Sequence, residues 1–272
     1  SLSSTVYLAR QVQPVRRLAA VKLLAPGATT EIISRRFAAE CEALASMQHS
    51  NVAQFFETSV HDGRPYVAME YVDGRTITAY ARIAQVAGEP LLRLFLQVCE
   101  GVAHAHQRGF IHRDLKPSNI LVTESDAGRP AVKVIDFGIA KATSARLTEK
   151  TVFTEFRQMI GTPEYMSPEQ AGDSNEDVDT RTDVYSAGVL LYELLTGSTP
   201  FDSQRLRSAA FGEMQRIIRE ENPPKPSTKL TRNPAAITDI ASARATPPSR
   251  LGAELRGELD WIVMKALEKD RQ

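Results

Sequence analysis

Three polar side chains that lie close together in the sequence are of the types that phosphoryl transfer uses. Moving a phosphoryl group to a hydroxyl requires a carboxylate near the attacking oxygen, positive charge on the phosphate and oxygen ligands for Mg²⁺. Asp114, Lys116 and Asn119 provide these groups within six residues. A surface loop of mixed charge can contain Asp114 and its neighbours by chance, but the full run of eight residues from His112 to Asn119 makes that explanation weak.

A second carboxylate, Asp136, follows an apolar segment that is predicted to be a strand. The end of a strand can direct a side chain into a cleft, and Gly138 allows the chain to change direction sharply. An ordinary strand-ending Asp in a turn has the same local sequence. The position of Asp136, 17 residues after Asn119 and across one predicted hairpin, favours the functional interpretation.

A third pair of interest is Lys22, in the strand-like segment Ala19-Ala20-Val21-Lys22, and Glu40. Glu40 lies within an apolar helical stripe formed by Ile33, Phe37, Leu44 and Met47. A carboxylate buried there without a partner costs on the order of several kcal/mol, which makes Lys22 the obvious ion-pair partner. There are two alternatives: Glu40 lies at the edge of the stripe and reaches water, or Lys22 points to solvent, because strand faces alternate.

The elements that must position these groups divide into a sheet-rich first part and a helical second part. Strands are predicted at 5–10, 17–24, 52–60 and 66–71, with a hairpin turn at Asp62-Gly63 and a helix from Thr29 or Thr30 to about Gln48. Short strands at 120–122 and 132–135 and helices at about 91–105, 184–195 and 261–267 follow after residue 74. Residues 222–250 contain six prolines and are expected to form a surface loop.

The composition is that of an ordinary globular protein. Of 272 residues, 42% are hydrophobic, and 33 basic residues balance 33 acidic ones, which does not favour binding to nucleic acid or an anionic membrane. Cys41 and Cys99 both lie in helical patterns, which predicts buried free thiols and a reducing cytoplasm. The most apolar run, 184–195, is too short to span a bilayer and contains Glu193, so no membrane segment is expected within these residues.

These segments resemble the catalytic domain of eukaryotic-type protein Ser/Thr kinases, in the bacterial branch. The run from His112 to Asn119 resembles the catalytic loop, Asp136-Phe137-Gly138 the metal-binding motif, and Gly161 to Ala171 the end of the activation segment. The resemblance covers nearly the whole chain. It implies an α+β, two-lobed kinase-like fold: a small β-rich lobe with one helix at 1–70, a hinge at 71–74, and a larger, mainly helical lobe at 75–272 in which 222–250 form a Pro-rich surface insertion.

The resemblance also implies a role for each matching residue. Asp114 is expected to be the catalytic base with Lys116 beside it, and Asn119 and Asp136 are expected to hold Mg²⁺. The ion pair of Lys22 with Glu40 is expected to direct the lysine onto the α- and β-phosphates of ATP. Residues expected to support the site are His112, Arg113, Phe137, Gly138 and Asp183, of which Asp183 braces the catalytic loop.

The same resemblance implies ATP and Mg²⁺ as cofactors and proteins with Ser or Thr as substrates. Adenine is expected to bind the hinge backbone from Glu70 to Val72. The side chains expected around it are Met69, Val6, Ala20 and Leu121. Thr162 is expected to help select Ser or Thr, and Glu169 ends the activation segment. His104 and His106 are two residues apart on a predicted helix and do not share a face, so they do not predict a metal site.

Arg113, beside the catalytic Asp, is typical of kinases that are controlled through the activation segment. A phosphate in that segment could pair with Arg113 and order it. Thr151 and Thr154 lie in the middle of the segment and are the preferred autophosphorylation sites, with self-association of the domain as the expected means. The resulting expectation is a cytoplasmic role in bacterial signalling.

Both ends of the chain depart from the family pattern. Ser1 and Ser4 align with two glycines of the Gly-rich loop, and the chain stops before the family's final helix. We interpret the sequence as truncated at both ends; a complete gene with a degenerate nucleotide loop is the alternative. A pseudokinase is a second possible function, although Lys22, Asp114 and Asp136 are present. A small-molecule phosphotransferase of the aminoglycoside-kinase type is a third, although that class lacks so long an activation segment.

Overall fold

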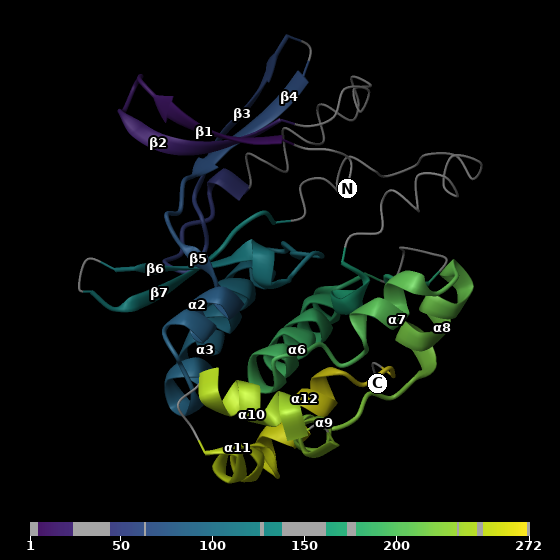
Figure 1. The fold of residues 1–272 in the computed structure, drawn as a ribbon. Coiled ribbons are helices and arrows are strands. Elements are labelled where there is room, and N and C mark those ends of the chain that lie inside the picture. The colour runs from purple at the N-terminus through teal and green to yellow at the C-terminus, as the bar shows by residue number, and fades with distance from the viewer. Residues whose placement is uncertain are drawn as a thin grey trace.

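A four-stranded antiparallel sheet forms the N-terminal part of the computed structural model (Figure 1). The structure describes residues 5–23, 44–62, 64–125, 128–137, 162–172, 178–232, 234–243 and 247–270. The strands are β1 (Thr5–Gln11), β2 (Arg17–Leu23), β3 (Phe55–His61) and β4 (Arg64–Glu70), in the spatial order β1-β2-β4-β3. The predicted strands are therefore confirmed, except that Val52 bridges Val134 instead of opening β3.

The register of this sheet decides which side chains share a face. Residues directly opposite each other in neighbouring strands lie on the same face. Val6 pairs with Lys22, and Ala20 pairs with Met69. Because Ala20 and Lys22 are two residues apart in β2, all four side chains lie on one face. This face therefore carries the residues expected around ATP.

Helices dominate the rest of the chain, and a small second sheet lies between them and the first sheet (Figure 1). This second sheet contains β5 (Arg75–Thr76), β6 (Ile120–Glu124) and β7 (Pro130–Val134). The two central helices are α3 (Gly88–His106) and α6 (Thr180–Thr196). Around them lie α2 (Ile77–Ile83), α7 (Ser203–Ser208), α8 (Phe211–Glu220), α9 (Pro226–Arg232), α10 (Pro234–Ala243), α11 (Pro248–Leu255) and α12 (Glu258–Ala266).

The boundaries of α6 follow from its sequence. The Asp179 carboxylate accepts a hydrogen bond from Arg181 N at the first turn, and Gly197 ends the helix at a φ of 72°. Between them the helix is buried on nearly every side, as its apolar sequence predicts. It therefore acts as the rigid support on which the catalytic loop and the end of the activation segment pack.

One hydrophobic core extends from the first sheet into the helical part. It includes Phe55 and Met69 from the sheet, Leu91 from α3, Leu115 from the catalytic loop and Leu190 from α6. All five side chains are nearly inaccessible to solvent. The loop that carries Asp114 is thus fixed by burial of its neighbour Leu115, which removes conformational freedom from the site.

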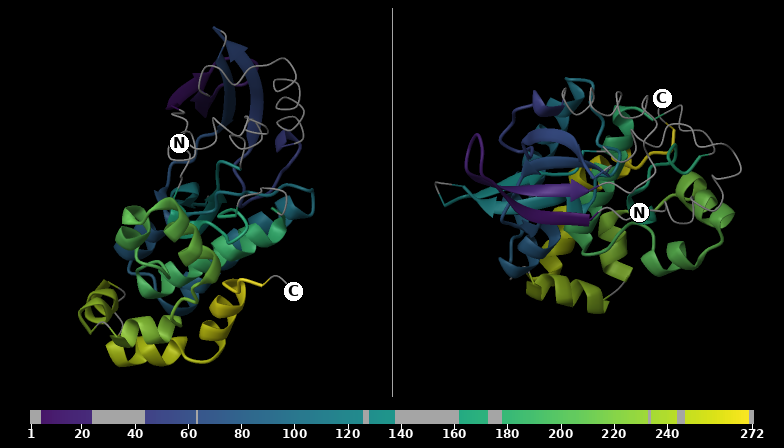
Figure 2. Two further views of the ribbon diagram at one scale, coloured as in Figure 1. Left: turned by 90° about the vertical axis from the view of Figure 1, so that its right-hand side faces the viewer. Right: turned by 90° about the horizontal axis from the view of Figure 1, so that it is seen from above.

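The prediction that residues 222–250 form a surface loop was wrong. This segment contains α9, α10 and the start of α11 (Figure 2). It buries Leu230 and Ala241. The prolines misled the prediction because Pro226, Pro234 and Pro248 are each the first residue of a helix. Proline is favoured at that position, because its missing N–H has no partner there and its φ is already helical.

The predicted helix from Thr29 or Thr30 to about Gln48 lies mostly outside the described residues, so it stays a prediction. The helices predicted at 91–105, 184–195 and 261–267 correspond to α3, α6 and α12. None of the helices described is long and apolar enough to cross a membrane.

Candidate active site

Asp114 and Lys116 form a close ion pair in the catalytic loop. Lys116 Nζ lies 2.8 Å from Asp114 Oδ2, and the aspartate side chain is 36% exposed. Asn119 Nδ2 donates to the Asp114 carbonyl at 2.8 Å and to Oδ2 at 3.2 Å. The carboxylate is therefore held in place but open to solvent, as a base that accepts a proton from an incoming hydroxyl must be.

Asn119 and Asp136 lie on adjoining chain segments. A 3₁₀ turn, η1 (Pro117–Asn119), ends at Asn119 directly before β6, and Ile135 N donates to Asn119 O at 2.9 Å. Asp136 is the next residue. The Asn119 amide nitrogen is turned toward Asp114, so its Oδ1 points elsewhere, with Ser118 Oγ at 3.4 Å. The segments thus bring an amide oxygen and a carboxylate into one region.

These oxygen donors fit Mg²⁺. This ion is usually held by one or two carboxylates together with substrate phosphates, and it seldom has a complete protein cage. Within the described part of the chain there is no cluster of three or more His, Cys, Asp or Glu side chains that could hold a metal by itself. The donor set is therefore suited to a metal ion that arrives with a nucleotide.

Lys22 reaches this region from the first sheet. Its Nζ lies 2.5 Å and 2.6 Å from the two carboxylate oxygens of Asp136, and the lysine side chain is only 9% exposed. The expected partner Glu40 lies outside the described residues, so that ion pair stays a prediction. The alternative in which Lys22 points to solvent does not hold, because Lys22 is buried.

Asp183 on α6 supports the catalytic loop through hydrogen bonds to its backbone. Its carboxylate is fully buried and accepts from the backbone nitrogens of His112 at 2.7 Å and Arg113 at 2.8 Å. His106 Nε2 from α3 contacts the same carboxylate at 2.7 Å. The role expected for Asp183 agrees with these contacts. His106 is a partner that sequence reasoning missed, because a spacing of two on a helix was tested only for metal binding.

His112 connects the loop to the segment that carries Asp136. Its ring is fully buried, with Nδ1 accepting from Asp114 N at 3.2 Å and Nε2 lying 3.0 Å from the Ile135 carbonyl. The neutral imidazole with its proton on Nε2 satisfies both contacts. Phe137 packs against the ring, with centroids 4.7 Å apart. His112 and Phe137 are both buried and pack against each other beneath the loop.

Two non-glycine residues of the site have a left-handed backbone: Arg113 with a φ of 63° and Asp136 with a φ of 65°. Such a conformation costs on the order of 1–3 kcal/mol and persists only where its surroundings hold it. Asp183 holds the Arg113 nitrogen, and Gln170 Nε2 donates to the Arg113 carbonyl at 2.7 Å. Gln170, from the motif at the end of the activation segment, is a second support that the sequence did not predict.

The side chain of Glu70 faces away from the expected adenine position. Its Oε2 lies 3.0 Å from Lys133 Nζ on β7 and accepts from Gln54 N at 3.0 Å. Its own backbone nitrogen donates to Gln54 O at 2.8 Å. Glu70 therefore has a carbonyl but no free N–H to offer a ligand. Its carboxylate joins the hinge to the second sheet, a contact that no local pattern indicated.

Other predicted residues are placed as follows. Val72 lies in the hinge after β4, and Leu121 lies in β6 opposite Thr76 and Lys133. Thr162 precedes a second 3₁₀ turn, η2 (Pro163–Tyr165), and lines a hollow together with Lys116. Glu169 accepts from Thr182 Oγ1 at 2.5 Å. Glu40, Gly138, Thr151 and Thr154 lie outside the described residues.

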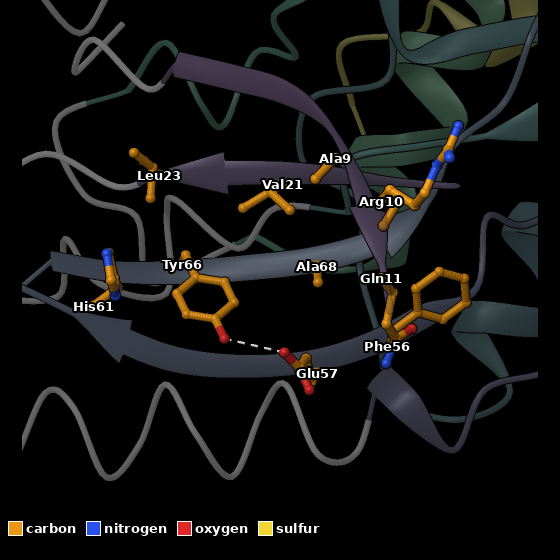
Figure 3. A pocket seen from close by; sticks show the side chains of 11 residues that line it. Ala9, Arg10, Gln11, Val21, Leu23, Phe56, Glu57, His61, Tyr66 and Ala68 are labelled. Atoms are coloured by element: carbon orange, nitrogen blue, oxygen red, sulfur yellow. Dashed lines mark hydrogen bonds between the residues drawn. The ribbon is translucent and has the colours of Figure 1, made fainter. Parts of the chain in front are cut away.

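A separate hollow of about 350 Å³ lies on the other face of the first sheet (Figure 3). Its lining includes Ala19, Val21 and Leu23 of β2, which alternate with Ala20 and Lys22. It therefore lies opposite the face that carries the predicted nucleotide residues, and it is not the nucleotide site.

Comparisons with known proteins agree with this geometry. The family model of the protein kinase domain matches residues 2–262. The serine/threonine-protein kinase Pkn1 of Myxococcus xanthus is 36% identical over 264 residues, which are 97% of this chain and 33% of that protein. PknB of Mycolicibacterium smegmatis is 34% identical over 272 residues, covering 98% of this chain and 38% of that protein.

Solved structures of kinase domains resemble this chain as well. The crystal structure of the Mycobacterium tuberculosis PknI kinase domain is 27% identical and superposes with a TM-score of 0.59, covering 98% of this chain and 91% of that one. The chain belongs to the protein kinase domain family, and the curated relatives named here are serine/threonine-protein kinases. It spans about a third of the length of the curated relatives that it matches.

Proposed function

We propose that this domain transfers the γ-phosphoryl group of ATP to serine or threonine hydroxyls of protein substrates. The observation that supports this most strongly is the convergence of five side chains from β2, the catalytic loop and the end of the β6–β7 hairpin: Lys22, Asp114, Lys116, Asn119 and Asp136. In this proposal Asp114 accepts the hydroxyl proton, and Lys22 binds the α- and β-phosphates. Asn119 and Asp136 would hold Mg²⁺, which offsets phosphate charge when bound.

Adenine binding is proposed for the face of the sheet that carries Val6, Ala20 and Met69, with Leu121 on the opposite side. The Glu70 carbonyl and the backbone of Val72 would hydrogen-bond the base. Support comes from the register that puts the three sheet residues on one face with Lys22. We also propose that Thr162 helps to select Ser or Thr, because it lines the same hollow as Lys116.

Radiolabelled ATP tests this proposal against its two alternatives. Label should enter a generic basic protein in the presence of Mg²⁺ and should not enter a panel of aminoglycosides. Transfer to an aminoglycoside alone would instead support a small-molecule phosphotransferase. Nucleotide binding without any transfer would support a pseudokinase.

We further propose that two copies associate and autophosphorylate at Thr151 and Thr154, and that the domain acts in bacterial signalling in the cytoplasm. Support comes from Arg113 beside the catalytic base and from the bacterial kinases among the relatives. Peptide mapping after incubation with Mg-ATP should find phosphate on these threonines, and Asp114→Asn should abolish it. Phosphate found only within 222–250 would contradict the proposal.

A further inference from the structure

Lys133 and Glu70 form an ion pair that joins the first sheet to the second. Glu70 is the last residue of β4, Lys133 lies on β7, and Lys133 Nζ is 3.0 Å from Glu70 Oε2. Lys133 Nζ also lies 3.5 Å from the Val52 carbonyl. The lysine and glutamate side chains are 20% and 30% exposed, so solvent screens this pair less than a fully exposed one. The ion pair therefore links two elements that are 63 positions apart in the sequence.

Glu70 is bound through both its side chain and its backbone. Gln54 N donates to Glu70 Oε2 at 3.0 Å, and Glu70 N donates to Gln54 O at 2.8 Å. Of the carboxylate contacts that the structure describes, the one from Gln54 N remains once the Lys133 ammonium group is removed. A half-buried carboxylate without a cation is costly, so it would turn toward water. Because the carboxylate and the nitrogen are both held, the direction of the Glu70 carbonyl depends on these contacts.

Lys133 also lies next to the proposed adenine position. It pairs with Leu121 across β7 and β6, and residues opposite each other in neighbouring strands share a face. Leu121 is the residue proposed to lie on the far side of the base. Asp136, a proposed Mg²⁺ ligand, follows three residues after Lys133. The segment that carries a proposed metal ligand therefore also supports the hinge residue whose carbonyl is proposed to bind adenine.

The exocyclic amine of adenine is a hydrogen-bond donor, and the Glu70 carbonyl is an acceptor. A hydrogen bond weakens steeply when its donor and acceptor are misaligned. We infer that Lys133 is a positioning residue for nucleotide recognition: its ion pair with Glu70 holds the hinge carbonyl in the direction that accepts from the adenine amine. Lys133 acts through Glu70 and not through the phosphates or the metal. This inference rests on the proposed function, because it uses the adenine position proposed above.

Two nucleotides that differ only in this amine test the inference. Purine riboside triphosphate is ATP with hydrogen in place of the amine. Calorimetric titration with Mg²⁺ gives the Kd of both nucleotides for the wild type and for Lys133→Met, a change that removes the charge and keeps a long side chain. In the wild type, ATP should bind roughly tenfold more tightly than its analogue, the usual net effect of one hydrogen bond. In Lys133→Met that ratio should fall to about one, while kcat at saturating ATP stays nearly unchanged, because a contact that only binds the nucleotide affects KM.

Further variants identify the ion pair as the cause. Lys133→Arg keeps a cation and should restore the preference for ATP. Glu70→Gln should lose it as Lys133→Met does, and the double variant should lose no more, since both changes remove the same interaction. Glu70→Gln also carries the test should Lys133→Met fail to fold. Lys225→Met, a matched change of an exposed lysine before α9, should behave as the wild type does.

The outcomes separate this inference from the proposed function. A wild-type protein that binds neither nucleotide, or that transfers no phosphoryl group, would contradict the proposed function. Weaker binding of both nucleotides by the same factor in Lys133→Met would show a general structural role and overturn the inference alone. So would an unchanged preference for ATP in folded Lys133→Met protein. Equal binding of the two nucleotides by the wild type would overturn it as well, while leaving phosphoryl transfer from ATP intact.

Discussion

Lys22 Nζ lies within 2.6 Å of both carboxylate oxygens of Asp136, although the two residues are 114 positions apart in the sequence. This contact joins the N-terminal sheet to the segment that carries a predicted metal ligand. A nucleotide that binds between the lobes would therefore contact Lys22 and Asp136 while they form one ion pair. Substitutions at either residue should affect phosphate and metal binding together.

The first prediction concerns Asp136→Asn. Loss of the carboxylate charge should weaken Mg²⁺-dependent ATP binding by tenfold or more, because the remaining amide oxygen is a weaker ligand for a hard cation. ATP binding measured without Mg²⁺ should change much less. Calorimetric titrations with and without Mg²⁺ measure both values. Asp62→Asn changes a highly exposed aspartate and is the matched control. Equal Mg²⁺ dependence in Asp136→Asn and wild type would contradict the assignment.

The second prediction separates catalysis from binding. Asp114→Asn should reduce turnover by about 10²–10⁴-fold, the usual contribution of a general base, while the Kd of Mg-ATP stays near that of the wild type. The reason is that the proposed role of Asp114 concerns the substrate hydroxyl, while its side chain contacts Lys116 and Asn119 within the same loop. Initial rates and nucleotide titrations on the same preparation test this. A parallel loss of nucleotide affinity would show that Asp114 has a different role.

The third prediction concerns the brace under the catalytic loop. Asp183→Asn removes the charge that accepts two backbone N–H groups, and each hydrogen bond to a charged group contributes about 1.5–3 kcal/mol. We expect a melting temperature several degrees lower, together with lower turnover, because Arg113 loses the contact that holds its positive φ. His106→Gln breaks only the side-chain contact and should have a smaller effect. Equal losses in the two variants would show that the backbone contacts are unimportant.

The fourth prediction concerns Cys99, the free cysteine among the described residues. Burial raises the pKa of its thiol to about 11. At pH 8 only about one thiol in a thousand is then ionised, so alkylation at Cys99 should be roughly a hundredfold slower in the folded protein than in denaturant. The rate should rise about tenfold per pH unit until the thiol titrates. Mass spectrometry of the peptide that contains Cys99 gives the rate, and rapid labelling at pH 7 would contradict the raised pKa.

Residues that lie in a continuous local motif could be proposed for the site from the sequence alone. Asp114, Asn119 and Asp136 lie in segments whose pattern is continuous along the chain, and the predicted hairpin between the last two is present as β6–β7. Partners from distant segments could not be identified in this way. The contacts of His106 with Asp183, of Gln170 with Arg113 and of Lys133 with Glu70 each depend on how separate elements pack.

The segment at 222–250 shows a second limit of prediction from sequence. Its prolines predict a loop, although proline is unfavourable only in the interior of a helix and is favoured at its first residue. Only the apolar residues that follow the prolines, such as Leu230 and Leu251, distinguish the two cases. Both are buried with Tyr192 of α6 in a second hydrophobic core, which lies among the C-terminal helices. Counting apolar positions after each proline would have indicated helices.

The paired strands of the β6–β7 hairpin set the spacing between Asn119 and Asp136, because one residue lies just before the hairpin and the other just after it. Pairing begins at Ile120 with Val134, close to both predicted ligands, and ends at the fifth pair, Glu124 with Pro130. Residues added at that far tip should leave Asn119 and Asp136 in place. One residue added within a strand would instead turn every following side chain to the other face. Natural variants of this chain should therefore differ freely in the length of the tip and hardly at all within the paired strands. The tip is accordingly a place where a fluorophore or an affinity tag can be inserted without disturbing the predicted metal ligands.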